Sequence, residues 1–203
     1  MVLYCGKVFT EGSLQVILCV MNRATLAEKL GLPHRTSILL QKAKGLGLAD
    51  ASALEVLAVS RGCWHYRQPE MPDPLSVEET QFTNEELAIA LLSPSQPYSP
   101  HTIRLGAAML GAAENRAETL LKLAKAEHCE IGVRYIANAG LQFEPNNSLW
   151  HELLAKLPQI PDPEDGIFPH PTRFVSSTGF TRAGRGSVTI WIRPRADLAL
   201  VDG

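Results

Sequence analysis

Apolar residues recur at helical spacing along most of the chain. The clearest example is the stretch 114–128, in which Leu120, Leu121 and Ala124 form one apolar stripe. Spacings of three and four residues place these side chains on one face of a helix, which packs against a core. The pattern predicts roughly eight helices, at about 25–31, 34–45, 52–61, 84–93, 100–112, 114–128, 130–139 and 148–157.

Short capping motifs mark where these helices begin and end. In a capping box, a hydroxyl accepts a hydrogen bond from an N–H of the first turn, and a Glu three residues later bonds back to the N–H of the cap. Three such boxes precede apolar runs, at Thr25–Glu28, Ser52–Glu55 and Thr83–Glu86. Ser99-Pro100 adds a cap followed by a proline at the first helical position. Gly31, Gly62 and Gly140 lie where helices are expected to end.

The two ends of the chain have a different pattern. Residues 2–21 are rich in Val, Ile, Leu and aromatic residues around a polar break, which predicts two short strands, with a helix from Ser13 as the alternative. Residues 173–180 and 187–193 are rich in β-favouring residues and flank a Gly- and Arg-containing loop, which predicts a hairpin. The predicted fold class is therefore mainly α, a bundle-like domain with a short N-terminal β element and a C-terminal β-hairpin.

Proline and charge divide the chain into predicted segments. Residues 1–67 hold the β element and the first helices, and residues 83–157 form a second helical subdomain. The acidic, proline-containing stretch 68–82 is predicted to link them. Residues 158–203 combine a proline-rich segment with the Arg-rich hairpin.

Overall composition excludes several protein classes. The chain has 203 residues, 45% of them hydrophobic, and a net charge of −2, so it is neither compositionally disordered nor strongly basic. The longest apolar run, Val16–Met21, is too short to span a bilayer. Lys7 interrupts the first apolar stretch, so no signal peptide is expected. The four cysteines form no C-x-x-C pair and are read as reduced thiols, which predicts a cytoplasmic protein.

Charge is distributed unevenly despite the small total. Residues 22–67 hold seven Lys or Arg against three acids, whereas residues 68–100 hold six acids and no Lys or Arg. Residues 173–195 hold five Arg and no acids. Such asymmetry favours polyanionic or acidic partners for the two basic segments.

The first basic segment resembles a helix-turn-helix motif over residues 25–48. Gly31 provides the turn, and the second helix would begin with residues that could meet base edges. Its candidate nucleic-acid-binding residues are His34, Arg35, Thr36, Ser37, Lys42 and Lys44. The spacing departs from the motif, because the core position six residues after the glycine is Ser37. A plain helical hairpin within a bundle is the alternative.

The second basic segment is a candidate anion-binding hairpin. Arginine forks bind phosphate or carboxylate with two parallel hydrogen bonds, and the neighbouring glycines let a backbone approach an anion. The arginines are Arg173, Arg182, Arg185, Arg193 and Arg195. A solvated hairpin tip is the alternative.

No recognised catalytic, cofactor or metal motif accompanies these segments. The chain lacks a G-x-S-x-G elbow, a P-loop and a G-x-G-x-x-G loop, and its Cys and His residues lack zinc-site spacing. We therefore predict a non-enzymatic binding or regulatory protein without a cofactor, with DNA binding through residues 25–45. The alternatives are a helical protein–protein module, oligomeric or with an acidic partner, and an enzyme with an unrecognised site.

Overall fold

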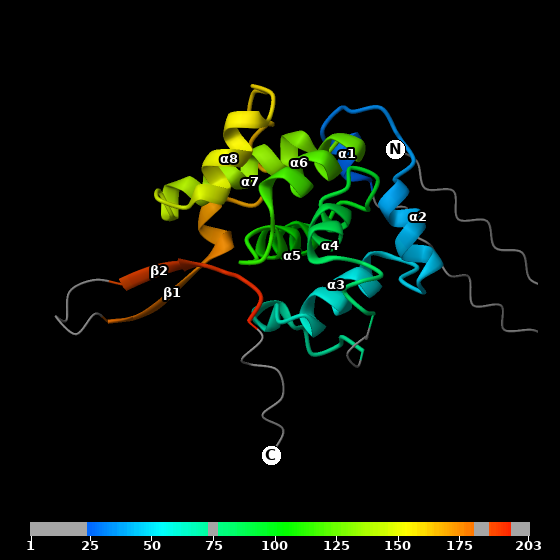
Figure 1. Cartoon of the computed structure of the whole chain (residues 1–203), viewed down its shortest axis with the longest axis horizontal. Coiled ribbons are helices and arrows are strands. Elements are labelled where there is room, and N and C mark those ends of the chain that lie inside the picture. The colour runs from blue at the N-terminus through cyan, green and yellow to red at the C-terminus, as the bar shows by residue number, and fades with distance from the viewer. Residues whose placement is uncertain (1–23, 73–76, 181–186, 196–203) are drawn as a thin grey trace, which may run out of the picture.

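The described residues fold into packed helices, and a small C-terminal hairpin extends from one side of them (Figure 1). The computed structural model describes residues 24–72, 77–180 and 187–195. The α-helices in these residues are α1 (Leu26–Lys29), α2 (Ile38–Gly45), α3 (Ala51–Ser60), α4 (Asn84–Leu91), α5 (Pro100–Leu110), α6 (Ala117–Ala126), α7 (Glu130–Phe143) and α8 (Ser148–Lys156). They are accompanied by the 3-10 helices η1 (Trp64–Tyr66) and η2 (Pro171–Phe174) and the strands β1 (Val175–Phe180) and β2 (Ser187–Trp191). The mainly α prediction and the hairpin are confirmed. The predicted β element at 2–21 lies outside the described residues.

Most predicted helix starts are present in the structure. The hydroxyl of Thr25 accepts from the Glu28 N–H at 3.2 Å, and the Glu28 carboxylate accepts from the Thr25 N–H at 2.8 Å. Thr83 and Glu86 form the same reciprocal pair at the start of α4. Ser99 caps α5, as predicted from the proline that follows it.

The third predicted capping box, at Ser52, does not form. Asp50 caps α3 instead, and its carboxylate accepts from the Ala53 N–H at 2.9 Å. The carboxylate of Glu55, the expected partner in the box, accepts a hydrogen bond from the Thr102 hydroxyl of α5. A tertiary contact therefore uses the Glu that the local motif would have needed.

Gly140 does not end α7, contrary to the prediction, and the helix continues to Phe143. A Cβ at Gly140 would lie only 2.5 Å from Cε2 of Trp150. Because no side chain fits there, the glycine permits close packing of α7 against α8 rather than a turn.

The core is centred on α4 and α5. Figure 1 shows these two helices in the middle of the molecule, with α3 on one side and α6, α7 and α8 on the other. Leu87, Leu105 and Met109 are fully buried there. Phe82, at the end of the predicted linker, is also fully buried, and residues on both sides of 68–82 contribute to this one core.

The hairpin is attached to the helices at its base. The strands pair antiparallel, with Val175 opposite Trp191. The indole of Trp191 is buried and donates a hydrogen bond to the Ala107 carbonyl at 3.3 Å. After β2, the Arg195 N–H donates to the carbonyl of Gly62, a residue with φ of +105° that ends α3 as predicted. These contacts fix the base of the hairpin on α3 and α5.

Candidate ligand-binding site

The predicted recognition helix begins four residues later than expected. Residues 34–36 precede α2, and Ser37 is its N-cap, with the Ser37 hydroxyl accepting from the Leu40 N–H at 3.0 Å. Ser37 is buried, whereas Ile38 is 67% exposed. The predicted turn glycine, Gly31, does have a positive φ, of +65°. Residues 34–37 therefore form an extended connection to a helix rather than the first turn of one.

The two predicted lysines of α2 have different surroundings. Lys42 Nζ lies 2.6 and 2.7 Å from the two carboxylate oxygens of Glu86 and 5.6 Å from the centre of the Phe82 ring. Lys44 is exposed to solvent. Both lysines are exposed, but Lys42 is paired with Glu86 and so joins α2 to α4.

The strands of the hairpin lie far from α2. Figure 1 shows the hairpin and α2 at opposite ends of the molecule. The guanidinium of Arg193 donates to both carboxylate oxygens of Glu144 and, at 2.6 Å, to the Gly111 carbonyl. Arg173 and Arg195 are exposed, and the predicted anion-binding residues Arg182 and Arg185 lie outside the described residues.

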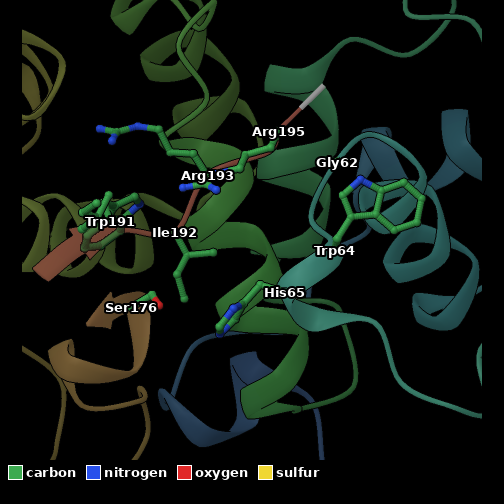
Figure 2. Close-up of a pocket in the computed structure, with 9 residues that line it drawn as sticks. Gly62, Trp64, His65, Ser176, Trp191, Ile192, Arg193 and Arg195 are labelled. Carbon is green, nitrogen blue, oxygen red and sulfur yellow. The ribbon is translucent and has the colours of Figure 1, made fainter. Parts of the chain in front are cut away.

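A cavity of about 370 Å³ lies beside the base of the hairpin. Figure 2 shows Trp64 and His65 of η1 on one side of it and Trp191 and Ile192 on the other. Arg193 also lines this cavity, but three of its five N–H donors bond to Glu144 and Gly111, and its charge is paired with Glu144. This arginine therefore anchors the hairpin, which makes the cavity a weak anion site.

A second cavity, of about 230 Å³, lies between the 32–35 connection and the start of α7. We call it the Glu127 cavity. Its apolar walls are Leu32, Pro33, Pro94, Ile131 and Ile160. Its polar residues are Arg35, Ser95, Glu127, His128 and Glu130. Apolar walls with a few convergent polar groups are typical of small-ligand sites.

Glu127 is the most unusual residue of this cavity. Its side chain is buried, with only 7% of the residue exposed. Carboxylate oxygen Oε1 accepts from the Leu39 N–H at 2.9 Å, so that Glu127, a residue distant in sequence, helps to cap the start of α2. The second oxygen, Oε2, is buried and has no hydrogen-bond partner among the residues that the structure describes. A buried acceptor without a donor is uncommon and costly.

His128 has a backbone conformation that usually belongs to glycine. Its φ is +55°, and among the described residues it is the only one besides glycines with a positive φ. The N–H of Cys129 bonds to the Ala124 carbonyl and the N–H of His128 to that of Lys125, which is the Schellman arrangement at the end of α6. Glycine is the common residue at this position of the motif, so the imidazole side chain is held there at some cost.

Arg35 also lines the Glu127 cavity and contacts His128. Its Nη1 lies 2.7 Å from His128 Nε2. A guanidinium only donates, so Nε2 accepts and the ring carries its proton on Nδ1. The Arg35 carbonyl accepts from the Ser95 hydroxyl, which fixes the backbone. Of the predicted nucleic-acid-binding residues, Arg35 therefore lines the same cavity as Glu127.

Sequence reasoning missed Glu127 and His128 as a site. One signal was available, because the helix predicted over 114–128 ends without the glycine that follows α1 and α3. The contact between Glu127 and Leu39 joins residues far apart in sequence and leaves no local pattern.

The two described cysteines, Cys63 and Cys129, are buried free thiols. Burial raises the pKa of the Cys63 thiol to about 12 and also raises the pKa of Cys129. In the described part of the chain, no three His, Cys, Asp or Glu residues come together as metal ligands. No helix within the same residues is long and apolar enough to cross a membrane.

Comparison of the chain with protein-family models, with curated proteins and with solved structures finds no match. We therefore infer a function from the geometry of the Glu127 cavity.

Proposed function

We propose that this chain is a non-enzymatic binding or regulatory protein that holds a small aliphatic amine in the Glu127 cavity. The observation that carries the proposal is the buried Glu127 oxygen Oε2, which has no donor. An ammonium group donates three hydrogen bonds and carries the opposite charge, so it matches this oxygen better than a neutral hydroxyl does.

Burial of the Glu127 oxygen Oε2 without a donor lowers the stability of the empty protein. Leaving a buried polar atom unpaired costs about 1–3 kcal/mol, and more for a charged group. The side chains of Arg35 and His128 line the same cavity but make no hydrogen bond to this oxygen. A bound amine would remove the penalty, which favours the loaded state.

The rest of the cavity suits a short aliphatic chain. Leu32, Ile131 and Ile160 offer only hydrocarbon surface. Each buried methylene contributes roughly 0.8 kcal/mol. The volume of about 230 Å³ is below the 300–1,000 Å³ range of typical ligand pockets, so the ligand is small.

The test is titration of 3-methylbutylamine into the protein, by calorimetry and by thermal unfolding. We expect saturable binding and a stabilisation of about 2.7 kcal/mol at a ligand concentration 100 times the Kd. The variant Glu127→Gln should lose at least tenfold in affinity. Its amide oxygen can still accept from the Leu39 N–H, so the cap of α2 is retained.

The matched control is Glu118→Gln, which removes the same charge from a side chain that is 75% exposed and paired only with Lys122. This variant should bind the amine as the wild type does. Absence of binding to the wild type, or equal binding by Glu127→Gln, contradicts the proposal.

DNA binding through residues 25–45 stays a prediction with less support. The N–H groups that open α2 already bond to Ser37 and Glu127, and Lys42 is paired with Glu86. A phosphate would have to displace these internal partners. Strands β1 and β2 lie at the end of the molecule opposite α2, so the two predicted basic segments do not reinforce each other in the described residues.

A further inference from the structure

We infer that the amine is part of a zwitterion, an α-amino acid with an aliphatic side chain, and that Arg35 binds its carboxylate. The inference rests on the proposed function and adds the second charged group of the ligand. Glu127, whose covered oxygen Oε2 lacks a donor, and Arg35, whose guanidinium has donors to spare, both line the Glu127 cavity, together with a second acidic residue, Glu130.

Arg35 is placed as a carboxylate-binding group. A guanidinium has five N–H donors, and the contact with His128 uses one of them. The side chain is exposed, and no acidic side chain pairs with it among the described residues. An arginine that is free of an acidic partner can bind a carboxylate with two parallel hydrogen bonds.

His128 acts as a positioning residue for Arg35. Its ring lies against the guanidinium, and its left-handed backbone determines the direction in which the ring leaves the chain. Ser95 fixes the other end of the arginine through the Arg35 carbonyl. A group held at both ends loses little freedom when a ligand binds, which favours recognition of one geometry.

Charge and size together select the ligand class. Glu127 and Arg35 line one cavity of about 230 Å³ and reach it from different elements. We expect a molecule that pairs with both charged side chains to carry an ammonium and a carboxylate. The hydrocarbon walls then select an aliphatic side chain over a polar one.

The experiment compares three ligands that differ by one group. L-Leucine carries both charges, 3-methylbutylamine is leucine without the carboxylate, and 4-methylpentanoate is leucine without the amine. Calorimetry should show that leucine binds at least tenfold more tightly than either. Arg35→Gln should reduce leucine to the affinity of the amine, and Glu127→Gln should reduce it to the affinity of the acid.

Two further variants test whether His128 positions Arg35. His128→Asn keeps an acceptor and tolerates a positive φ, so it should retain part of the preference for leucine over the amine. His128→Gly should lose that preference although its backbone is unstrained. Arg116→Gln, at an exposed arginine on the N-cap of α6, is the control for loss of an arginine and should change nothing.

The outcomes separate this inference from the proposed function. Equal affinity for leucine and 3-methylbutylamine overturns the zwitterion and leaves the amine site standing. Equal affinity for leucine and 4-methylpentanoate overturns the role of Glu127, and with it the proposed function. Failure of all three to bind overturns both. Circular dichroism of each variant confirms that it is folded before its affinity is compared.

Discussion

Glu127 and His128 are adjacent residues, and both occupy positions that lower the stability of the folded chain. Glu127 buries a carboxylate oxygen without a donor, and His128 takes up a left-handed backbone. Such costs are commonly found where a protein binds a ligand, because the ligand or its orientation compensates for them. Two of them in succession on one cavity wall mark this turn as the place to test by mutation.

The backbone strain at His128 can be measured directly. In the left-handed region a side chain costs roughly 1–2 kcal/mol, which glycine avoids. Neither His128→Gly nor His128→Ala keeps the contact with Arg35, so the pair isolates the backbone effect. We expect His128→Gly to be more stable than His128→Ala by about 1 kcal/mol in urea denaturation. Equal stability would show that the turn relaxes without strain.

His101 predicts a loss of stability in mild acid. Burial lowers its pKa below the ordinary value of 6.5, although Glu55 opposes this shift, and its Nε2 has no hydrogen-bond partner. The folded state therefore binds a proton less readily than the unfolded chain, so stability is full above pH 6.5 and falls as the pH drops below it.

Denaturation of the wild type and of His101→Gln at several pH values between 5 and 8 checks this prediction. The variant should lose much of the decline in stability below pH 6.5 that the wild type shows. His34→Gln, at an exposed histidine, controls for the removal of an imidazole. Identical pH profiles for the wild type and His101→Gln would contradict the prediction.

At the scale of elements, α3 tests which residue caps a helix. Asp50 accepts from the Ala53 N–H, whereas Ser52 is exposed and does not cap the helix. Loss of an N-cap typically costs about 1 kcal/mol. Asp50→Ala should therefore lower the free energy of unfolding by about that amount, and Ser52→Ala by much less. A larger loss of stability for Ser52→Ala than for Asp50→Ala would instead favour Ser52 as the cap of α3.

The packing of α7 on α8 gives a second prediction at this scale. Gly140→Ala introduces a methyl group where the nearest Trp150 atom would be 2.5 Å away, so we expect a loss of about 1–3 kcal/mol. At Gly45, in the last turn of α2, an added methyl group would have no atom of another residue within 4 Å beyond its own turn. Gly45→Ala should instead be neutral or stabilise by up to about 1 kcal/mol. Thermal or urea unfolding of both variants decides.

The elements also show what sequence could and could not predict. The capping boxes at Thr25 and Thr83 and the left-handed Gly31 follow from residues within one turn of each other, so local patterns predict them. The start of α2 depends on a hydrogen bond to Glu127. The capping box expected at Ser52 needs Glu55, and Thr102 of α5 bonds to that carboxylate instead. These contacts join distant parts of the chain, and no periodicity in the sequence reports them.

At the scale of the whole molecule, the described parts of the two basic segments lie at opposite ends. The basic residues of α2 lie at one end and the hairpin at the other (Figure 1). Two basic residues of these segments are paired with acidic residues of the same fold: Lys42 with Glu86, and Arg193 with Glu144. The uneven charge along the sequence thus partly reflects contacts that hold the fold together.

The Arg193–Glu144 pair should contribute to the attachment of the hairpin. Burial opposes ionisation of Glu144, but hydrogen bonds from Arg193, Trp150 and Asn147 outweigh it and lower its pKa. We expect Arg193→Met to lower the free energy of unfolding by about 1–3 kcal/mol, since a partly buried carboxylate loses its partner. Lys122→Met, at an exposed ion pair, should have a much smaller effect. Equal effects in denaturation would show that the hairpin does not depend on this pair.

The anchored base of the hairpin also provides an optical signal. Trp191 of β2 and Trp150 of α8 are both buried, with ring centres 5.1 Å apart, while the chain's third tryptophan, Trp64, is only partly buried. Indoles this close couple electronically, and hydration shifts their emission to longer wavelengths. Detachment of the strand would separate the pair and expose Trp191 to water. Intrinsic fluorescence therefore reports on the docking of the hairpin without any added dye.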